Sequence, residues 1–293
     1  MSDGNLRGIL LVLYSMAIFA VEDALMKHLS AAMPVGQLLI IIGLGGMAAF
    51  AALAGPHGRR GLWAALRNRP VFWRTAAEAV SAITFVTALS LIPLSTVAAV
   101  FQATPLAVTA GAALFLGETV GWRRWTAVAV GFAGVLMIIR PGLEGFRPEA
   151  GLVLITVFSI ALRDLVTRAI PASLSSAVVS FHGFLGVVVA GLVLIAAGQR
   201  PAMPDGSGMA LLVLTLFCAT TGYLAIVASM RAAEASALMP FRYARLIFSL
   251  AIGVLFFAER PDGLTLCGAA LILAAAFYTY LRERARKQVA AAA

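Results

Sequence analysis

Long apolar stretches recur along this chain of 293 residues and constrain its fold more than any other feature. A bilayer core about 30 Å thick needs about 20 apolar residues in each helix that crosses it. Stretches of about this length occur ten times, and Pro, Gly or charged residues separate most of them. They cover residues 6–28, 34–54, 71–92, 95–116, 121–139, 149–169, 175–197, 208–230, 236–257 and 262–281. The sequence therefore predicts an all-α, polytopic membrane protein with ten transmembrane helices.

Composition supports this prediction and excludes several classes of protein. Hydrophobic residues make up 61% of the chain and charged residues 12%, whereas soluble domains carry about 25% charged residues. The net charge of +9 would suggest nucleic-acid binding in a soluble protein. Here the basic residues lie in short loops and near the C-terminus, where membrane topology rules place them. We therefore expect the lipid bilayer as a partner and no nucleic acid.

The distribution of Lys and Arg predicts the orientation of the chain in the membrane. With the N-terminus in the cytoplasm, 14 of the 22 Lys and Arg residues fall on the inner side and five on the outer side. Cytoplasmic loops carry an excess of these residues, so both termini are expected in the cytoplasm. Glu22 and Asp23 follow the first apolar run where a signal peptide would have small residues, so we expect the first span to be uncleaved.

The second half of the sequence is a weak repeat of the first. Residues 116–118 (Leu-Gly-Glu) align with residues 257–259 (Phe-Ala-Glu), for example, and we call this register the repeat alignment. Each half then contains five spans, and because five is odd, the second half crosses the membrane in the opposite sense. Inverted-topology repeats of this kind are a feature of secondary transporters. We expect two five-helix units, at residues 1–141 and 148–287.

At this level of detail the chain resembles the EamA-type transporters of the drug/metabolite transporter superfamily. In each half an apolar helix, a Glu and a last helix follow one another. The stretches that carry the resemblance are residues 89–95 (LSLIPLS), 115–118 (FLGE) and 131–137 (GFAGVLM). The second half is a poorer copy, with Ala258 before Glu259 and Ala275 in place of Gly134. The resemblance implies export of small metabolites across the bacterial inner membrane. Within the superfamily the chain is most similar to bacterial exporters of amino acids, so aromatic or neutral amino acids are the expected substrates.

Ionisable residues inside the predicted spans are candidate functional residues, because each costs at least about 2.5–3.5 kcal/mol on insertion scales. Arg245 lies near the middle of its span, and its planar guanidinium suits a substrate carboxylate. Glu78 would then bind an ammonium group or carry a coupled proton. The alternative for both residues is structural: Arg245 pairs with Glu78 or another acid, and Glu78 pairs with Arg74.

The repeat alignment adds polar side chains at the same depth. Gln102 corresponds to Tyr243, and Thr104 corresponds to Arg245. Transporters built from inverted repeats bind substrate near the midplane, where the repeats meet. The candidate substrate-binding residues are Glu78, Gln102, Thr104, His182, Arg242, Tyr243 and Arg245. A lone intramembrane histidine such as His182 is alternatively a hydrogen-bonded structural residue.

Two acid–base pairs are candidate gates. Asp23 and Lys27 lie four residues apart near the outer end of the first span, and Asp164 and Arg168 are their counterparts near the inner surface. Opposite charges at this spacing stabilise a helix. Two hypotheses stay open: the pairs are ordinary helix-end contacts, or they form and break as access to the substrate alternates.

These observations predict a secondary transporter that works by alternating access and is not an enzyme. The HExxH, GxSxG and P-loop motifs are absent, so we expect no metal, no other cofactor and no direct use of ATP. Proton coupling, a monomer and a homodimer are all compatible with the sequence. The alternatives are a carrier of drug-like cations or of nucleotide or sugar derivatives, and a membrane-embedded lipid enzyme or scramblase.

Overall fold

The computed structural model describes residues 3–118, 121–143, 146–171, 173–232 and 235–292, and these ranges contain helices and no strand. The helices are α1 (Asp3–Leu29), α2 (Val35–Leu53), α3 (Gly55–Ala65), α4 (Arg69–Leu91), α5 (Leu94–Phe101), α6 (Thr104–Phe115), α7 (Trp122–Ile139), α8 (Ala150–Thr167), α9 (Ser176–Ala196), α10 (Gly206–Ala232), α11 (Ala235–Arg242), α12 (Ala244–Phe257) and α13 (Gly263–Ala292). The predicted all-α architecture is confirmed.

Within the described ranges, nine helical stretches are long and apolar enough to cross a membrane. Two of them, Leu94–Phe115 and Pro240–Phe257, each contain parts of two consecutive helices. The one predicted span outside these nine stretches, residues 71–92, corresponds to α4, which has 23 residues and is therefore about 35 Å long. It is less apolar because it carries Arg74 and Glu78. The number of ten crossings stays a prediction.

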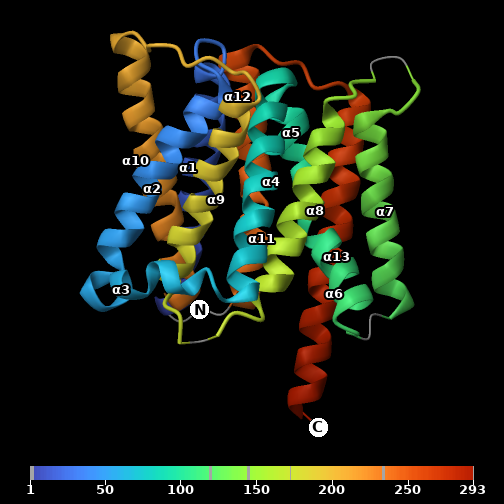
Figure 1. The fold of residues 1–293 in the computed structure, drawn as a ribbon. Helices are drawn as coiled ribbons and strands as arrows, with labels where there is room; N and C mark the ends of the chain where they lie inside the picture. Colours follow the sequence, from blue (N-terminus) through green and yellow to red (C-terminus); the bar gives the residue numbers. More distant parts are fainter. Residues whose placement is uncertain (1–2, 119–120, 144–145, 172, 233–234, 293) are drawn as a thin grey trace.

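The helices run side by side as one bundle, and α1 begins at the same end of the bundle at which α13 finishes (Figure 1). The short helix α3 also lies at this end. Following the predicted orientation, we call it the inner end and the opposite end the outer end. All four Trp residues belong to helices that begin or lie at the inner end: Trp63, Trp73, Trp122 and Trp125. Tryptophan is enriched at the membrane–water interface, so these residues indicate where the bilayer surface lies.

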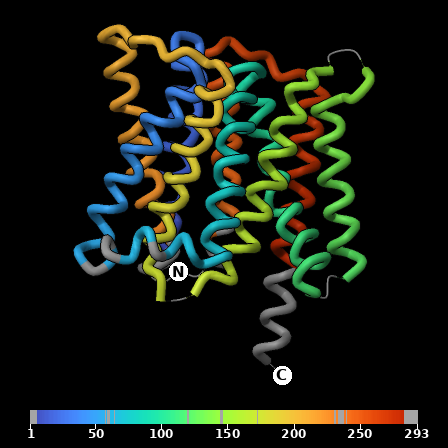
Figure 2. Tube along the Cα trace, viewed as in Figure 1, coloured from blue at the N-terminus to red at the C-terminus, as the bar shows by residue number. Residues whose placement is uncertain are grey.

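Segments of the two halves lie next to one another in the bundle (Figure 2). The repeat alignment maps Leu94–Phe101 (α5) directly onto Ala235–Arg242 (α11), and every other spanning helix maps onto a helix of the second half. The most extensive contacts are α2 with α9, α7 with α13, α1 with α10, and α4 with α8. The alignment maps the pair α2–α9 onto itself, and likewise the pair α7–α13. It maps the pair α1–α10 onto the pair α8–α4, as expected if a two-fold axis relates the two halves. The boundaries 1–141 and 148–287 stay a prediction.

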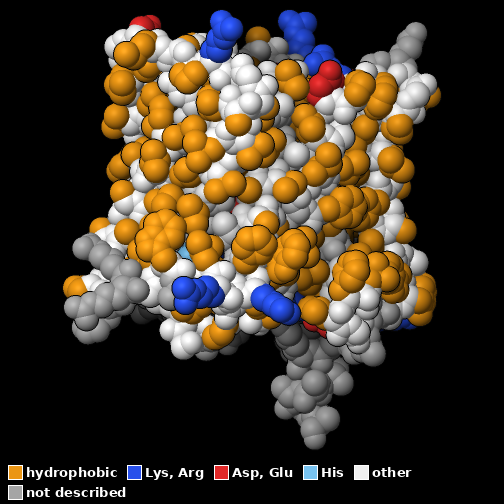
Figure 3. Space-filling model, in the orientation of Figure 1, with side chains coloured by type: hydrophobic (Ala, Val, Ile, Leu, Met, Phe, Trp, Pro, Cys, Tyr) orange, Lys and Arg blue, Asp and Glu red, His pale blue; other side chains and the backbone are white. Residues whose placement is uncertain are grey.

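The sides of the bundle, between its inner and outer ends, suit a lipid environment. On the face shown in Figure 3, hydrophobic side chains cover the middle of the molecule, and Lys and Arg gather near the upper and lower edges. Large apolar side chains such as Leu255 and Phe256 are more than three-quarters exposed. Because lipid tails and not water solvate such surfaces in a bilayer, this distribution agrees with a multi-pass membrane protein.

The contact between α2 and α9 depends on two glycines. A Cβ on Gly191 would lie 2.5 Å from the carbonyl oxygen of Gly36, and a Cβ on Gly36 would lie 2.9 Å from that of Gly191. We expect Gly191→Ala to destabilise the protein by about 1–3 kcal/mol, because the two backbones must move apart. Thermal unfolding in detergent measures this loss. The matched control is Gly151→Ala in α8, where a Cβ meets no atom within 4 Å. An unchanged melting temperature for Gly191→Ala would contradict the prediction.

Candidate functional site

Two spans are interrupted at equivalent places. The first is broken between Phe101 and Thr104, where Gln102 follows the end of α5, and the second at Tyr243, which precedes α12. The predicted spans 95–116 and 236–257 correspond to the stretches Leu94–Phe115 and Pro240–Phe257, and the structure adds a short turn within each that the sequence did not indicate. Prolines explain part of this, because Pro105 in the first turn of α6 has no N–H to donate to the preceding turn. Gln102 and Thr104 are both buried.

Arg245 and Asp23 form an ion pair that connects α12 to α1. The Nη2 atom of Arg245 donates to both carboxylate oxygens of Asp23 at 2.7 Å, and its Nε donates to Oδ2 at 3.1 Å. The guanidinium carbon lies 5.4, 5.7 and 5.1 Å from the ring centres of Phe19, Phe85 and Phe101. Aromatic rings at this distance stabilise a cation. Arg245 thus pairs with Asp23 and not with Glu78. An ion pair of Arg245 with an acid of the protein was the structural alternative to a substrate-binding role.

Lys27 does not form the predicted pair with Asp23. Its Nζ donates to the main-chain oxygens of Leu89 at 2.9 Å and Ile92 at 2.5 Å, at the outer end of α4. It also lies close enough to Glu259 for an electrostatic attraction. The reason for the correction is geometric: the end of α4 offers Lys27 carbonyl oxygens at the outer surface, while Asp23 faces the guanidinium of Arg245. The side chain therefore ties α1 to α4 across the bundle.

Glu259 binds the beginning of α5. Its Oε1 accepts a hydrogen bond from the backbone N–H of Leu94 at 2.6 Å, and Oε2 accepts one from the N–H of Ser95 at 2.9 Å. A carboxylate is stabilised at a helix N-terminus by the unpaired N–H groups and by the helix dipole. Gly253 leaves room for this side chain, since a Cβ there would lie 2.6 Å from Oε2. Glu259 thus holds the second half against the first at the outer end.

A second group of charges lies toward the inner end. Nη1 of Arg163 donates to both carboxylate oxygens of Glu78 at 3.3 Å, and Nη2 donates to Oδ1 of Asp164 at 2.8 Å. The predicted alternative pair of Glu78 with Arg74 is not formed, because Arg74 donates to the main-chain oxygen of Val179 in α9 instead. Arg163 lies inside a predicted span but received no role from the sequence. The cost of an arginine at that depth is the signal that could have found it.

Arg168 pairs with Glu118 at 2.6 Å, and not with Asp164 as predicted. The correction has a local reason: Arg163 is adjacent to Asp164 and takes its carboxylate. In the repeat alignment, Glu118 and Arg168 are the counterparts of Glu259 and Lys27. The inner pair is about half exposed, with side-chain exposures of 48% and 51%.

The remaining candidates differ in their surroundings. His182 is fully buried, and its ring nitrogens lie 2.7 Å from the oxygen of Val178 and 2.9 Å from that of Leu62. These contacts link α9 to α3, as the structural alternative for His182 requires. Arg242 is exposed and lies within electrostatic range of Asp164 and Arg163. Among the described residues, no group of three His, Cys, Asp or Glu side chains could hold a metal ion.

At the outer end of the bundle, Arg140 and Asp262 connect the end of α7 to the start of α13. Nη2 of Arg140 donates to both oxygens of the carboxylate. The backbone N–H of Thr265 donates to Oδ1 at 3.0 Å. These hydrogen bonds, that of Arg140 first, hold the pKa of the Asp262 carboxyl well below its usual range. This pair lies outside the two interrupted helices and supplies a control for the central ion pair.

The fold and the site define a class of protein. Membrane-spanning helices in two inverted halves, each with one interrupted helix and polar or charged side chains at the break, are the features of multi-pass transporters built from inverted repeats. The chain belongs to the EamA-like transporter family, whose sequence model matches residues 6–140 and 148–281. This confirms the resemblance to EamA-type transporters.

Three relatives illustrate the range of the family. The chain is 28% identical to an S-adenosylmethionine uptake transporter of Rickettsia felis, over 67% of this chain and 66% of that protein. It is 29% identical to a riboflavin transporter of Rhizobium johnstonii, over 73% and 71%. It is 25% identical to a pseudopaline exporter of Pseudomonas aeruginosa, over 92% and 94%. The chain thus spans just under two thirds of the length of the first of these relatives.

A solved crystal structure shares the fold. The two chains superpose with a TM-score of 0.61 at 20% identity, over 97% of this chain and 99% of that one. Together these findings make the chain a multi-pass bacterial membrane protein. The family and the relatives are named as transporters, in agreement with the prediction that the chain is not an enzyme. None of these three relatives is named an amino-acid exporter.

Proposed function

We propose that this chain is a secondary transporter that carries a small metabolite across the membrane by alternating access. The observation that carries the proposal is the pair of equivalent interruptions, between α5 and α6 and between α11 and α12. Each break is a short turn, in which Gln102, Ala103 and Tyr243 keep right-handed backbone angles. Such a change in the helical hydrogen-bond pattern at membrane depth is tolerated where it is buried in protein or lines a water-filled cavity. In transporters of this construction, such breaks surround the substrate. The substrate site then lies between the two halves, next to Gln102 and Tyr243.

The side chains near the breaks indicate the chemistry of the substrate. Arg245 can bind a substrate carboxylate in place of Asp23, since its planar fork suits either carboxylate. The rings of Phe19, Phe85 and Phe101 around it can stack on a planar ring. We infer a metabolite that carries a carboxylate and an aromatic or heteroaromatic ring. Aromatic amino acids are the smallest members of this class, and the relative named for S-adenosylmethionine favours a larger member. Riboflavin, for which another relative is named, shares the planar ring but has no carboxylate.

The two ends of the bundle support alternation. At the outer end, Asp23 is 5% exposed and Glu259 is bonded to the beginning of α5. At the inner end, the equivalent pair of Glu118 and Arg168 is about half exposed. We infer that this conformation is closed toward the outside. Because the halves are related by the repeat, exchange of these two arrangements would open the outer end and close the inner one.

Counterflow in proteoliposomes tests the proposal. Vesicles loaded with unlabelled phenylalanine, S-adenosylmethionine or riboflavin should take up the same labelled compound for at least one of the three. The variant Gln102→Ala/Tyr243→Phe should lose most of this flux, whereas Tyr278→Phe, which is partly exposed on α13, should keep it. Comparing the flux under pH gradients of opposite sign then shows whether transport is coupled to protons, and whether substrate and protons move in the same or in opposite directions. Folded protein without flux for any of the three compounds would contradict the proposal.

A further inference from the structure

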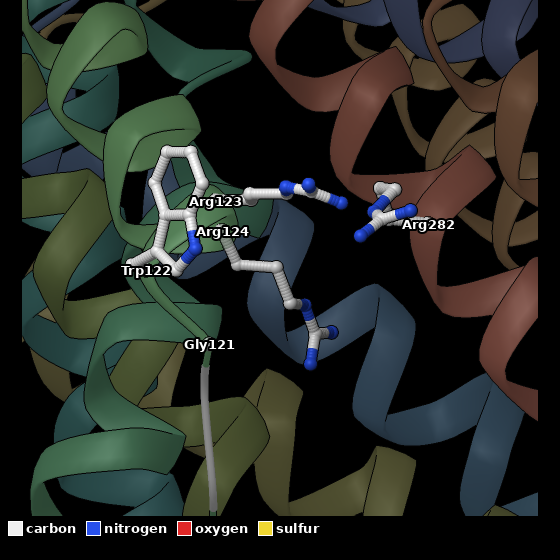
Figure 4. A pocket seen from close by; sticks show the side chains of 5 residues that line it. All are labelled: Gly121, Trp122, Arg123, Arg124 and Arg282. Carbon is white, nitrogen blue, oxygen red and sulfur yellow. The ribbon is translucent and has the colours of Figure 1, made fainter.

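A pocket at the inner end of the bundle is separate from the helix breaks. It has a volume of about 160 Å³ and is lined by Gly121, Trp122, Arg123, Arg124 and Arg282. Figure 4 shows that Arg123 and Arg124 come from the start of α7 and Arg282 from α13, and that their guanidinium groups extend into the space between the two helices. Three arginines from two helices that pack closely together therefore share one small cavity.

The electrostatics of this pocket favour an anion. None of its five lining residues is acidic, and the first turn of α7 contains no Asp or Glu. The N-terminus of a helix adds about half a positive charge in the same place. Arg123 and Arg282 bring two positive charges together from two helices, and an anion between them would relieve their repulsion. The planar forks of arginine bind phosphate oxygens in pairs. The pocket thus has the charge and the donors for a phosphate group.

The position of the pocket indicates where that phosphate comes from. Trp122 is 71% exposed, and the guanidinium of Arg123 lies 5.3 Å from its ring centre. Exposed tryptophans of this kind lie at the level of the lipid headgroups. Basic pockets between transmembrane helices on the cytoplasmic side bind the headgroups of anionic lipids. A lipid of the inner leaflet can therefore reach this pocket without leaving the membrane.

We propose that the pocket between α7 and α13 binds the phosphate of an anionic phospholipid from the cytoplasmic leaflet. Arg123 and Arg282 hold the phosphate oxygens from opposite sides, and Trp122 packs beside the headgroup. Because α7 and α13 are the last helices of the two halves, the bound lipid connects the halves at their inner ends. This inference stands apart from the transport proposal, since it concerns a site at the inner end of the bundle and not the helix breaks.

Native mass spectrometry of the purified protein tests this site. With equal amounts of phosphatidylglycerol and phosphatidylcholine, the wild-type protein should retain phosphatidylglycerol preferentially. Each arginine near an anionic surface contributes about fivefold to affinity, so Arg123→Gln/Arg282→Gln should weaken phosphatidylglycerol binding roughly 25-fold. The matched control Arg67→Gln/Arg69→Gln removes the same charge from exposed positions at the inner end and should change binding less than about threefold.

Two further measurements complete the test. Melting temperatures in phosphatidylcholine alone should agree between the wild type and the pocket variant, which shows that the variant is folded. Inorganic phosphate at millimolar concentration should neither displace the lipid nor raise the melting temperature as phosphatidylglycerol does. The proposal is overturned if the wild type has no preference for phosphatidylglycerol, if the control loses as much binding as the pocket variant, or if free phosphate stabilises the protein as well as the lipid.

Discussion

Replacing Arg245 by Gln is expected to abolish transport and to destabilise the protein by about 3–5 kcal/mol. The reason for the second effect is that Asp23, which is 5% exposed, would remain buried without its partner, and breaking a buried ion pair from one side carries a cost of this size. The loss of transport follows from the proposed exchange of Asp23 for a substrate carboxylate. Thermal unfolding in detergent and counterflow in proteoliposomes measure the two effects.

The double variant Asp23→Asn/Arg245→Gln separates these effects. It removes both charges together, so we expect it to recover most of the stability, since neutral replacement of a buried pair is often tolerated. It should nevertheless remain without transport, because no cation is left for the substrate carboxylate. The control is Arg140→Gln/Asp262→Asn, which neutralises the ion pair between α7 and α13 at the outer surface and should transport normally. Wild-type flux in the Asp23 and Arg245 double variant would show that this pair is structural.

The fold could be predicted from the sequence because the bilayer restricts the choices. Backbone polar groups in lipid must be satisfied within the segment, so an apolar stretch of sufficient length becomes a helix. The repeat also contained information on the site. In the repeat alignment, Lys27 maps onto Arg168, and Glu118 maps onto Glu259. In the structure, Lys27 and Glu259 lie at the outer end of the bundle, and their counterparts Arg168 and Glu118 lie at the inner end.

The partners of the charged side chains could not be predicted in the same way. Spacing along one helix favours pairs such as Asp23 with Lys27, but the contribution of such a pair is only about 0.2–0.5 kcal/mol. Contacts between helices outweigh it, as the three hydrogen bonds from Arg245 to Asp23 show. Such contacts depend on the rotation and depth of each helix, which hydropathy does not specify. The interruption at Tyr243 was missed for a similar reason, since a short break leaves the apolar stretch unchanged.

Neutralising Glu259 and Glu118 is expected to shift the conformational equilibrium in opposite directions. Glu259 bonds two backbone N–H groups at the start of α5 and so stabilises the closed outer end. Hydrogen bonds to a charged group contribute about 1.5–3 kcal/mol, so Glu259→Gln should raise the population open to the outside about tenfold or more. By the relation between the halves, Glu118→Gln should favour opening toward the inside, because Arg168 loses its acidic partner.

Labelling of single cysteines by a membrane-impermeant maleimide measures this shift. The background replaces Cys218 and Cys267 by Ala, and Thr96→Cys in α5, near the outer end, reports access from outside. We expect faster labelling in Glu259→Gln and slower labelling in Glu118→Gln, each compared with the cysteine variant alone. Glu149→Gln is the matched control, because it removes an acid from the exposed loop before α8 and should leave the rate unchanged. Labelling rates that change in the same direction in Glu259→Gln and Glu118→Gln would contradict alternation between symmetric ends. If the two ends are related by a two-fold axis, weakening the contacts that close one end must favour opening of that end and closure of the other.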